Sequence, residues 1–454
     1  MNDRIPRALP FSRRTFLVGS MLVATLGSGA TTAGARRQVP RGPTRGLVTR
    51  WDTDPWSLGS YSALPVGTAP SVRETLASTV VSGRVVLAGE HVNSAHPATV
   101  QGAYRSGQNA ARLLIERGVA RATKTVVVIG AGVAGLAAAQ ALKAAGATVV
   151  VLESRDRIGG RVWTDTSWGA PIELGAAWVH GVKRNPVPAL VRSGGSTLVP
   201  TNYDDQVVHT IDGARLKGLA PAEVQLDRIV TKMESRPSPI AASVGAVLRA
   251  SGWQSSVLNN WLVETHLTQE YGLGPALLGA QALYEGDWLH GGDAFVKGGY
   301  NVVPNELARG IAVRLSSPAI AVSARSGQAA VTLRSGEILG ADGVVVAVPL
   351  SILQRRALRI EGLPTSARLA IDGLRMGSLE KVILQYSDRW WPQAQGFGVV
   401  GGPDRRWTAW FDLTELVGAP TLVGFSAATA AAGRPRSDAA CMREAANLFA
   451  AAFG

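Results

Sequence analysis

The chain has 454 residues, enough for two domains with a sizeable core, and only 17% of them are charged, which excludes a largely disordered protein. Its formal net charge is +13, but the basic residues are scattered and no basic run is interleaved with aromatic residues, so we expect no nucleic-acid partner. The single cysteine, Cys441, excludes an internal disulfide and a CxxC metal site, and the six dispersed histidines predict no metal site.

Residues 1–35 are interpreted as an export signal. The sequence SRRTFL (12–17) fits a twin-arginine pattern, an apolar stretch follows to about Ala30, and AGA (33–35) offers a cleavage site. Glycine, serine and threonine interrupt the stretch, so it predicts no stable membrane span. We therefore expect the twin-arginine export machinery to carry the folded protein to the periplasm or the extracellular space. The alternative is a chance Arg-Arg pair, and cleavage stays open.

A linker is predicted at residues 36–46, which are rich in Arg, Pro and Gly. Further along, residues 124–144 have the pattern of a strand, a tight turn and a helix, because the buried run VVVI is followed by apolar residues at helical spacing. The turn contains GxGxxG, formed by Gly130, Gly132 and Gly135. The first glycine permits the turn, the second lets the backbone approach a diphosphate, and the third lets the helix pack on the strand. The diphosphate is expected at the helix N-terminus, which favours negative charge.

A second apolar strand, from Thr148 to Leu152, ends in Glu153. In dinucleotide-binding units an acidic side chain at this distance from the glycines binds the ribose hydroxyls. The alternative is a glycine turn in any doubly wound sheet, and the strand, the helix and the acid together count against it. The sequence therefore predicts an adenine dinucleotide site.

The next residues carry a resemblance to a known family. Glu153, Arg155, Gly159, Gly160 and Arg161 form ExRxxxGGR, and GAPIELGAAWVHG follows at 169–181. These two blocks resemble the FAD signature of the flavin-containing amine oxidases, in particular the polyamine oxidases, monoamine oxidases and histone demethylases. The resemblance implies non-covalent FAD, since the only cysteine is far in sequence from the matching region.

The blocks of this family stand in an unexpected order. The stretches 47–70 and 83–118 resemble blocks that close the chain in the family, yet here they precede the dinucleotide strand. The region from 270 to 392 resembles the family's middle, and the chain stops at Gly454 where the first of those closing blocks is expected. We interpret this as a circular permutation, since chain termini often lie close together. The six residues 118–123 reach at most about 20 Å, which favours docking within one chain over docking onto another molecule.

The resemblance implies the following FAD contacts. Glu90 matches the glutamate at the ribityl chain, or is a surface carboxylate. Thr99 and Val100 open a helix aimed at the flavin pyrimidine ring, where Thr99 also serves as a helix cap. The backbone of Ala319 is expected beside the adenine. The full expected set is Gly130, Ala131, Gly132, Ala134, Gly135, Glu153, Arg155, Gly160, Arg161, Ala177, Trp178, Ala319, Glu90, Thr99 and Val100.

Four residues are implied on the amine side. Tyr61 matches one wall of an aromatic cage, which favours the neutral amine over the ammonium, or is a core residue. Thr99 stands at the opposite wall, as in the polyamine-oxidase and demethylase branches. His180 faces the substrate channel or satisfies a backbone group. Glu270 matches a glutamate of the amine tunnel or is a solvated helix acid.

One family feature is expected to be missing. The family usually has a lysine, shortly after the block that VAVPLSIL (346–353) matches, that holds a water against flavin N5. The sequence has no lysine from Gly298 to Glu380, and Gln354, Arg355, Arg356 and Arg359 occupy the region instead. An arginine is not a like-for-like replacement. We therefore expect amine oxidation to survive and reoxidation by O2 to be slower.

The predicted fold is α/β, with a Rossmann-type FAD-binding domain and a mixed α+β substrate domain in permuted order. The expected segments are the signal peptide 1–35, the linker 36–46, FAD-binding 83–200 and 297–349, and substrate-domain 47–82, 201–296 and 350–454. The expected function is FAD-dependent oxidation of a polyamine-like small molecule with O2, giving an imine, an aldehyde and H2O2. The alternatives are a desaturase or protoporphyrinogen-oxidase-like enzyme and a flavin-binding protein without activity. The amine, the bond that is cleaved and the oligomeric state stay open.

Overall fold

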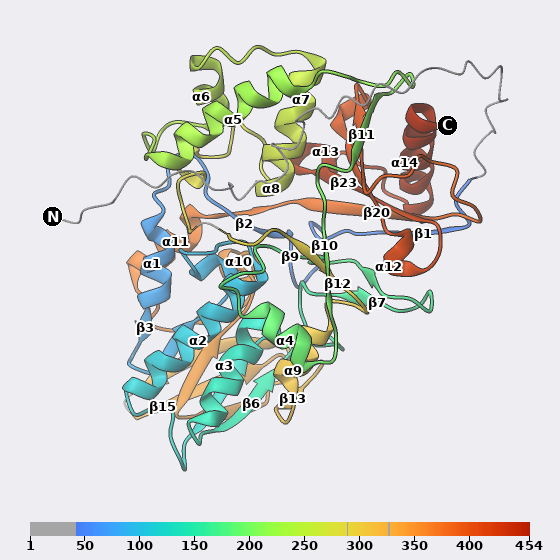
Figure 1. The fold of residues 1–454 in the computed structure, drawn as a ribbon. Helices are drawn as coiled ribbons and strands as arrows, with labels where there is room; N and C mark the ends of the chain where they lie inside the picture. Colours follow the sequence, from blue (N-terminus) through green and yellow to red (C-terminus); the bar gives the residue numbers. More distant parts are fainter. Residues whose placement is uncertain (1–41, 288, 326) are drawn as a thin grey trace.

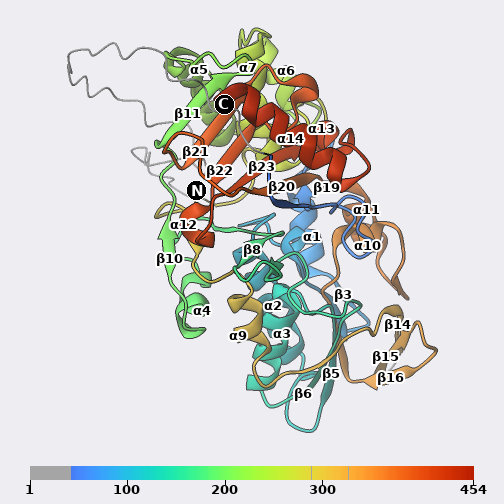
Figure 2. The same cartoon turned by 90° about the vertical axis from the view of Figure 1, so that its right-hand side faces the viewer.

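The computed structural model describes residues 42–454 except Trp288 and Ser326, so the expected signal peptide lies outside the described residues. Two halves are stacked along the long axis of the molecule (Figures 1 and 2). In one half, helices α2 and α3 cover a largely parallel sheet. In the other, a second sheet lies between helix α14 on one side and the layer of α5, α6 and α7 at the end of the molecule.

The first sheet has six strands in the order β13-β6-β5-β17-β4-β3. Their bounds are Ala312–Arg314, Thr148–Leu152, Thr125–Ile129, Gly343–Val346, Val85–Leu87 and Val80–Val81. All neighbours run parallel except β3, which is antiparallel to β4. The central strands are valine-rich and buried, as a parallel sheet covered on both faces requires.

Helices α2 (Val100–Glu116) and α3 (Val133–Ala144) pack together on one face of this sheet. A Cβ on Gly107 would overlap the carbonyl oxygen of Ala134, so the two backbones approach as closely as glycine permits. Helices α4 (Val187–Ser193) and α9 (Val302–Ala308) complete this layer. A smaller sheet beside it contains β14 (Ala319–Arg325), β15 (Gln328–Leu333), β16 (Ile338–Ala341) and β18 (Arg359–Ile360).

The second large sheet has the order β1-β20-β23-β22-β21-β11. Its strands are Arg45–Val48, Leu379–Gln385, Thr421–Ala427, Ala409–Asp412, Gly396–Val400 and Gln206–Thr210. Alternation along a strand sends neighbouring side chains to opposite faces. One face, with Trp410, packs against α14 (Asp438–Phe453), and the other, with Phe411 and Phe425, packs against Trp178 and Phe295.

Trp178 and Phe295 belong to a three-stranded sheet that lies between the halves. Its order is β10-β12-β9, with bounds Leu198–Pro200, Ala294–Val296 and Trp178–Val179. Two short pairs of strands lie nearby, namely β2 (Tyr61–Ala63) with β19 (Arg375–Gly377) and β7 (Thr164–Asp165) with β8 (Ile172–Glu173). The remaining helices are α1 (Ser71–Ser78), α5 (Ala220–Ser235), α6 (Val244–Ala250), α7 (Val257–Val263), α8 (Gln269–Tyr271), α10 (Leu350–Gln354), α11 (Thr365–Gly373), α12 (Thr414–Val417) and α13 (Ala428–Ala432).

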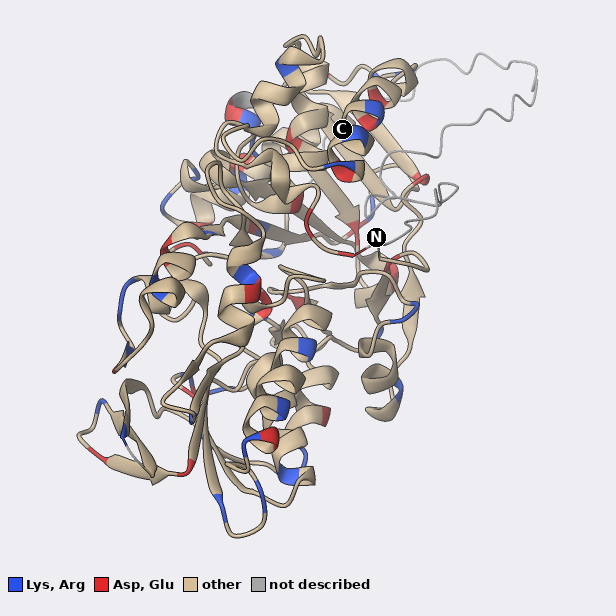
Figure 3. Ribbon diagram, turned by 90° about the vertical axis from the view of Figure 1, so that its left-hand side faces the viewer, with Lys and Arg blue, Asp and Glu red and all other residues tan. Residues whose placement is uncertain are grey.

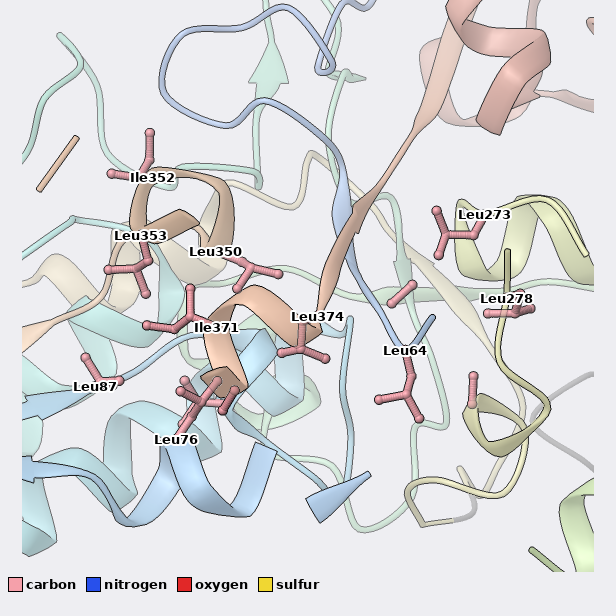
Figure 4. Packing of buried hydrophobic residues seen from close by; sticks show 14 of the residues in the cluster. Leu64, Leu76, Leu87, Leu273, Leu278, Leu350, Ile352, Leu353, Ile371 and Leu374 are labelled. Carbon is pink, nitrogen blue, oxygen red and sulfur yellow. The ribbon is translucent and has the colours of Figure 1, made fainter. Parts of the chain in front are cut away.

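Residues 42–118 contribute to both halves. Strand β4 lies beside β17 in the first sheet, and β1 pairs with β20 in the second. Figure 4 shows Leu76 from α1 close to Ile371 from α11 in one hydrophobic cluster. The early segment is therefore an integral part of the same folded molecule.

A buried ion pair ties this segment to the substrate half. Arg73 of α1 is fully buried and forms two hydrogen bonds to Glu285, at 3.0 and 3.1 Å, and others to Ser62 and His91. Breaking a buried pair by removing one partner costs about 3–5 kcal/mol, because the remaining charge stays buried.

We expect Arg73→Met to lower the free energy of unfolding by that amount, measured by urea denaturation of the FAD-bound protein. Arg112→Met is the matched control, because Arg112 pairs with Glu116 on the exposed face of α2 and such pairs contribute about 1 kcal/mol or less. Equal losses in the two variants would contradict the prediction.

Candidate functional site

The site begins at the turn between β5 and α3. Gly130 has φ +105°, and a Cβ there would lie 2.6 Å from the carbonyl oxygen of Ala347. A Cβ on Gly135 would overlap the carbonyl oxygen of Gly130. At Gly132, by contrast, a Cβ would meet nothing within 4 Å. The turn therefore needs the outer two glycines for packing and leaves open space at the middle one, where a diphosphate fits against the N-terminus of α3.

This difference gives a prediction. Gly132→Val should fold, because its side chain enters open space, but should lose most FAD affinity, because the side chain fills the diphosphate position. FAD content after purification and a fluorescence titration of the apoprotein with FAD measure the effect, which we expect to be at least about 100-fold. Gly340→Val is the control, since Gly340 on β16 also has open space around it but lies away from the turn. Unchanged affinity of Gly132→Val would contradict the assignment.

A second glycine turn packs on the first. Gly159 donates its N–H to the carbonyl of Ala131 at 2.8 Å, and a Cβ on Gly160 would lie 3.5 Å from the Cα of Gly132. Glu153 accepts the N–H groups of Ala131 and Arg155, at 2.7 and 2.9 Å. The carboxylate thus fixes the shape of the loop, and it lies where the ribose is expected.

The guanidinium of Arg155 does not extend into open space. It forms a two-fold hydrogen bond with Asp54, at 2.6 and 2.9 Å, and a third bond with Ser57. Arg155 therefore attaches the early segment to the dinucleotide unit. Sequence reasoning passed over Arg157 in the same motif, whose Nη2 is buried without a hydrogen-bond partner. Burial lowers the pKa of Arg157 to about 10, and its unsatisfied donor suits an anionic ligand.

Glu90 is the hydrogen-bonding centre of the site. Its carboxylate accepts from Arg161 at 2.9 Å, from the N–H and hydroxyl of Ser62 at 3.1 and 2.7 Å, and from the N–H of Ala98 at 3.0 Å. Although burial raises the pKa of Glu90, Arg161 and the other charges lower it to about 2. The glutamate is therefore ionised, and it joins the glycine-turn arginine to the segments that carry Tyr61 and Thr99.

Thr99 is the N-cap of α2. Its hydroxyl accepts the N–H of Gly102 at 3.0 Å and donates to the carbonyl of His96 at 2.8 Å. Val100 is the first residue of the helix. That the backbone N–H groups of this helix end face a flavin ring stays a prediction.

The amine-side candidates divide into two groups. Tyr61 is buried, and its hydroxyl donates to the carbonyl of Gln269, next to Glu270. Burial, with the charge of Glu270, raises the pKa of Tyr61, so its hydroxyl stays neutral. His180 lies apart from this pair in sequence, and its Nδ1 is 2.8 Å from Oδ2 of Asp293. The sequence analysis placed His180 either toward the substrate channel or against a backbone group. The structure adds a hydrogen bond to a carboxylate.

Tyr203 connects the two groups. Its hydroxyl donates to Oδ2 of Asp293 at 2.9 Å, and both Asp293 and Glu270 act electrostatically on it, adding to burial in raising its pKa. Its ring also contacts Phe411. Glu270 is exposed at the residue level, whereas Asp293 is half-buried. Two carboxylates therefore act on one tyrosine.

An aromatic cavity adjoins these residues. Ala177, Trp178, Phe295, Phe425 and Lys381 are among the residues that line it. Trp178 contacts Phe295, Phe411 and Phe425, with ring centroids 4.6 to 5.8 Å apart. Such walls exclude water and disfavour charged amines.

The expected absence of a lysine shortly after VAVPLSIL (346–353) stays a prediction, and the next lysine along the chain is Lys381 on β20. Lys381 is buried on β20, on the face that carries Phe411 and Phe425, and its Nζ donates to the carbonyls of Glu173 and Gly175 at 2.8 and 2.6 Å. Burial lowers the pKa of Lys381 to about 8, an effect that Glu173 opposes.

The residues that follow VAVPLSIL do not line this cavity. Gln354 donates to the carbonyls of Ile371 and Leu374, and Arg355, Arg356 and Arg359 are exposed. A lysine in a buried strand, KVILQ (381–385), is the signal that could have identified Lys381.

Glu173 provides a pH test of this pair. Burial raises the pKa of Glu173 to about 7, and its carboxylate accepts the N–H of Tyr300 at 2.7 Å. Glu173→Gln removes the anion that favours the charged form of Lys381. A turnover limb controlled by Lys381 should therefore move to lower pH than in the wild type, whichever form is active. Glu337→Gln, at an exposed pair with Arg314, is the control, and an unmoved limb would contradict the coupling.

Strand β14, which begins at Ala319, lies close to Glu153. Ser317, two residues before it, donates its N–H to the carbonyl of Glu153 at 2.7 Å. The structure thus brings the strand of Ala319 to the glycine turns. Ala134 lies in the first turn of α3, under α2.

Two absences concern only the described part of the chain. Within residues 42–454, leaving aside 288 and 326, no helix is long and apolar enough to cross a membrane, and no group of three or more His, Cys, Asp or Glu is arranged to hold a metal ion. The ribbon in Figure 3 carries Lys and Arg on many elements, interspersed with Asp and Glu.

Comparison with known proteins gives two family matches. The model described as "Flavin containing amine oxidoreductase" matches residues 30–115, 133–258 and 276–451. The model of the alanine dehydrogenase/PNT C-terminal domain matches residues 82–164, the stretch around the dinucleotide turn.

Individual relatives agree with the first match. Polyamine oxidase 3 of Oryza sativa subsp. japonica is 33% identical over 327 residues, covering 66% of this chain and 67% of the relative. Lysine-specific histone demethylase 2 of Homo sapiens is 31% identical, over 59% of this chain and 35% of the relative. The solved structure of putrescine oxidase bound to putrescine has a TM-score of 0.56 at 25% identity, covering 68% of this chain and 76% of that one. The chain thus spans about two thirds of the length of the rice polyamine oxidase.

Proposed function

The chain belongs to the flavin-containing amine oxidoreductase family and is an FAD-dependent amine oxidase, and on this premise we propose that it oxidises a diamine or polyamine. The observation that carries the proposal is the pair of carboxylates, Glu270 and Asp293, that act on Tyr203. The ring of Tyr203 contacts Phe411, a member of the aromatic cluster whose other rings line the cavity. An apolar cavity favours a neutral amine at the reacting carbon. Carboxylates nearby bind the ammonium group that a diamine retains elsewhere in the molecule.

The residues of this chain suit FAD. The space at Gly132, the N-terminus of α3 and Arg161 would hold the diphosphate region, and Glu90 and the N-terminus of α2 would hold the flavin end. Bound FAD supplies the hydride acceptor, flavin N5, and its reoxidation by O2 gives H2O2. The protein orients the amine Cα–H, excludes water and accepts the ammonium proton, and the imine then hydrolyses. We propose that Lys381, although it lies on β20 and not directly after VAVPLSIL, takes over the role of the lysine that the family places near N5.

We propose that the order of segments is a circular permutation of the family fold. Two contacts support it at the new termini. Arg50 pairs with Asp438 at the start of α14, and a Cβ on Gly46 would meet Met442 one turn later. Thus β1, followed backwards, runs along α14 toward Gly454. From Met442 to Gly454 the helix rises about 18 Å, while residues 46 to 42 span about 13 Å in the same direction, so a short connection could join the two ends.

The extent of the alignments agrees with permutation. When two pieces of a chain have exchanged places, an alignment that keeps the sequence order can include only one of them. The alignments to the polyamine oxidase and the putrescine oxidase cover 66% and 68% of this chain, as this predicts. At the other junction, residues 118–123 join α2 directly to β5. Residues 42–118 can therefore occupy the position that they would have in the unpermuted fold.

We also propose export by the twin-arginine route, since folded export suits an enzyme that acquires FAD before leaving the cytoplasm. Fusing residues 1–46 to a reporter that needs twin-arginine export tests this. Loss of export when Arg13 and Arg14 become Lys is the expected result.

The function is tested by anaerobic mixing of the purified protein with an amine panel. We expect a yellow FAD protein whose 450 nm band bleaches faster with putrescine or spermidine than with benzylamine. Bleaching by monoamines alone would overturn the substrate class. FAD without bleaching by any amine would favour a desaturase-type enzyme or an inactive flavoprotein, and a colourless protein that does not take up FAD would favour a scaffold.

A further inference from the structure

Asp293 occupies the edge of the small sheet directly opposite His180. Antiparallel pairing places Ala294 across from Val179, so the next residues on each strand, Asp293 and His180, face each other. Oδ1 of Asp293 accepts the N–H of Gly181 at 2.9 Å, and Oδ2 accepts from His180 and Tyr203 at 2.8 and 2.9 Å. Both oxygens are therefore used, and the carboxylate cannot rotate without losing hydrogen bonds.

This geometry fixes the tautomer of His180. Although burial raises the pKa of Asp293, His180 and the backbone N–H of Gly181 lower it below its ordinary value, so the carboxylate is ionised and can only accept. Nδ1 of His180 must then carry the hydrogen in the 2.8 Å contact, and Nε2 becomes the basic nitrogen. The His180 side chain is 40% exposed, whereas that of Asp293 is 13% exposed.

The reaction needs a group that accepts a proton from the substrate amine. A diamine enters as an ammonium ion at neutral pH, and its nitrogen must lose a proton before the Cα–H bond can give up hydride. Tyr61 and Tyr203 have raised pKa values and are already protonated, so neither can accept this proton. Among the described residues, Asp293 also acts on Tyr300, and Glu270 acts on Tyr203. Lys183 and His290 form a bridge on the strand connections beyond Gly181.

We propose that Asp293 is a positioning residue that holds His180 in the tautomer able to take the substrate's ammonium proton through Nε2. The N–H bond of the ammonium breaks, its electron pair stays on the amine nitrogen, and the proton bonds to Nε2, leaving an imidazolium paired with the Asp293 carboxylate. This inference rests on the proposed amine oxidation and assigns a role to a residue that the family motifs do not contain.

Asp293→Asn separates positioning from mere structure. The amide keeps the shape of the side chain but can donate to Nδ1, which moves the His180 hydrogen to Nε2 and removes the basic nitrogen from the pocket. With putrescine as the probe, the rate of anaerobic flavin reduction at pH 7 should fall about 100-fold. The rate should then rise about tenfold per pH unit, as neutral amine becomes available, and approach that of the wild type above about pH 10.

Two further variants and one spectrum complete the test. Asp204→Asn removes an equal charge from an exposed neighbour of Tyr203, and its pH profile should match that of the wild type. Tyr203→Phe removes the other bond to Oδ2 but keeps the His180 contact, so its profile should keep the wild-type shape. Nitrogen-15 NMR of histidine-labelled FAD protein, with His180→Gln to assign the signal, should show Nδ1–H in the wild type and Nε2–H in Asp293→Asn.

A loss in Asp293→Asn that is equal at every pH, or one tautomer in both proteins, would overturn the inference while the amine oxidation stands. A wild type that no amine reduces at any pH would overturn the proposed function and this inference with it.

Discussion

Lys381→Met is expected to lower amine turnover at air saturation by at least about 100-fold while FAD stays bound. An ammonium group has three N–H bonds, and two of them go to the carbonyls of Glu173 and Gly175. We expect the third to hold the water near flavin N5. Removing a preorganised donor of this kind costs about 10²–10³ in rate, and methionine keeps the volume and the apolar stem.

Two measurements separate this effect from misfolding. The FAD spectrum and the urea midpoint show whether the variant retains the site, and separate stopped-flow records of reduction by putrescine and reoxidation by O2 locate the step that slows. Lys297→Met is the matched control, because Lys297 is an exposed lysine just after β12. Wild-type rates in both half-reactions would remove Lys381 from the mechanism.

Gly107→Val should abolish the folded FAD protein. A Cβ at this position would overlap the carbonyl oxygen of Ala134, and the backbones of two buried helices cannot separate without opening the core beneath them. Because Thr99 caps α2 and Gly132 begins α3, separation of the helices would displace both ends of the proposed FAD site. Soluble yield, FAD content and circular dichroism measure the loss.

Arg112→Val provides the comparison for Gly107→Val. Arg112 lies on the exposed face of α2, so valine there costs less than about 1 kcal/mol of helix propensity and does not meet α3. A Gly107→Val protein that purifies with full FAD would show that α2 does not pack on α3 as described.

The FAD half was predictable because its signals are local. GxGxxG, the flanking strands and Glu153 lie within 30 residues. Each glycine was expected for a different steric reason, and the space around Gly130, Gly132 and Gly135 in the structure agrees with those reasons. The family order of the segments then directed attention to Glu90 and Thr99, which hydrogen bonds connect to Arg161 through the Glu90 carboxylate.

The amine side was harder to predict because its partners are distant in sequence. His180 and Asp293 are 113 positions apart and meet only through the pairing of β9 with β12. Lys381 was given no role because a lysine in a valine- and isoleucine-rich strand has no short motif of its own. Its environment, two carbonyls of the GAPIELGAA block and an aromatic face, exists only after the two halves have come together.

The short connection between α2 and β5 affects the order in which the parts of the chain fold. Gln108 and Ala137, which bond across α2 and α3, are 29 positions apart, whereas Arg45 and Gln385 are 340 apart. Contacts between nearby positions need little loop closure and form early. We therefore expect the dinucleotide unit to assemble first and β1 to dock on β20 last, so that the earliest strand in the sequence completes the second sheet at the end of folding.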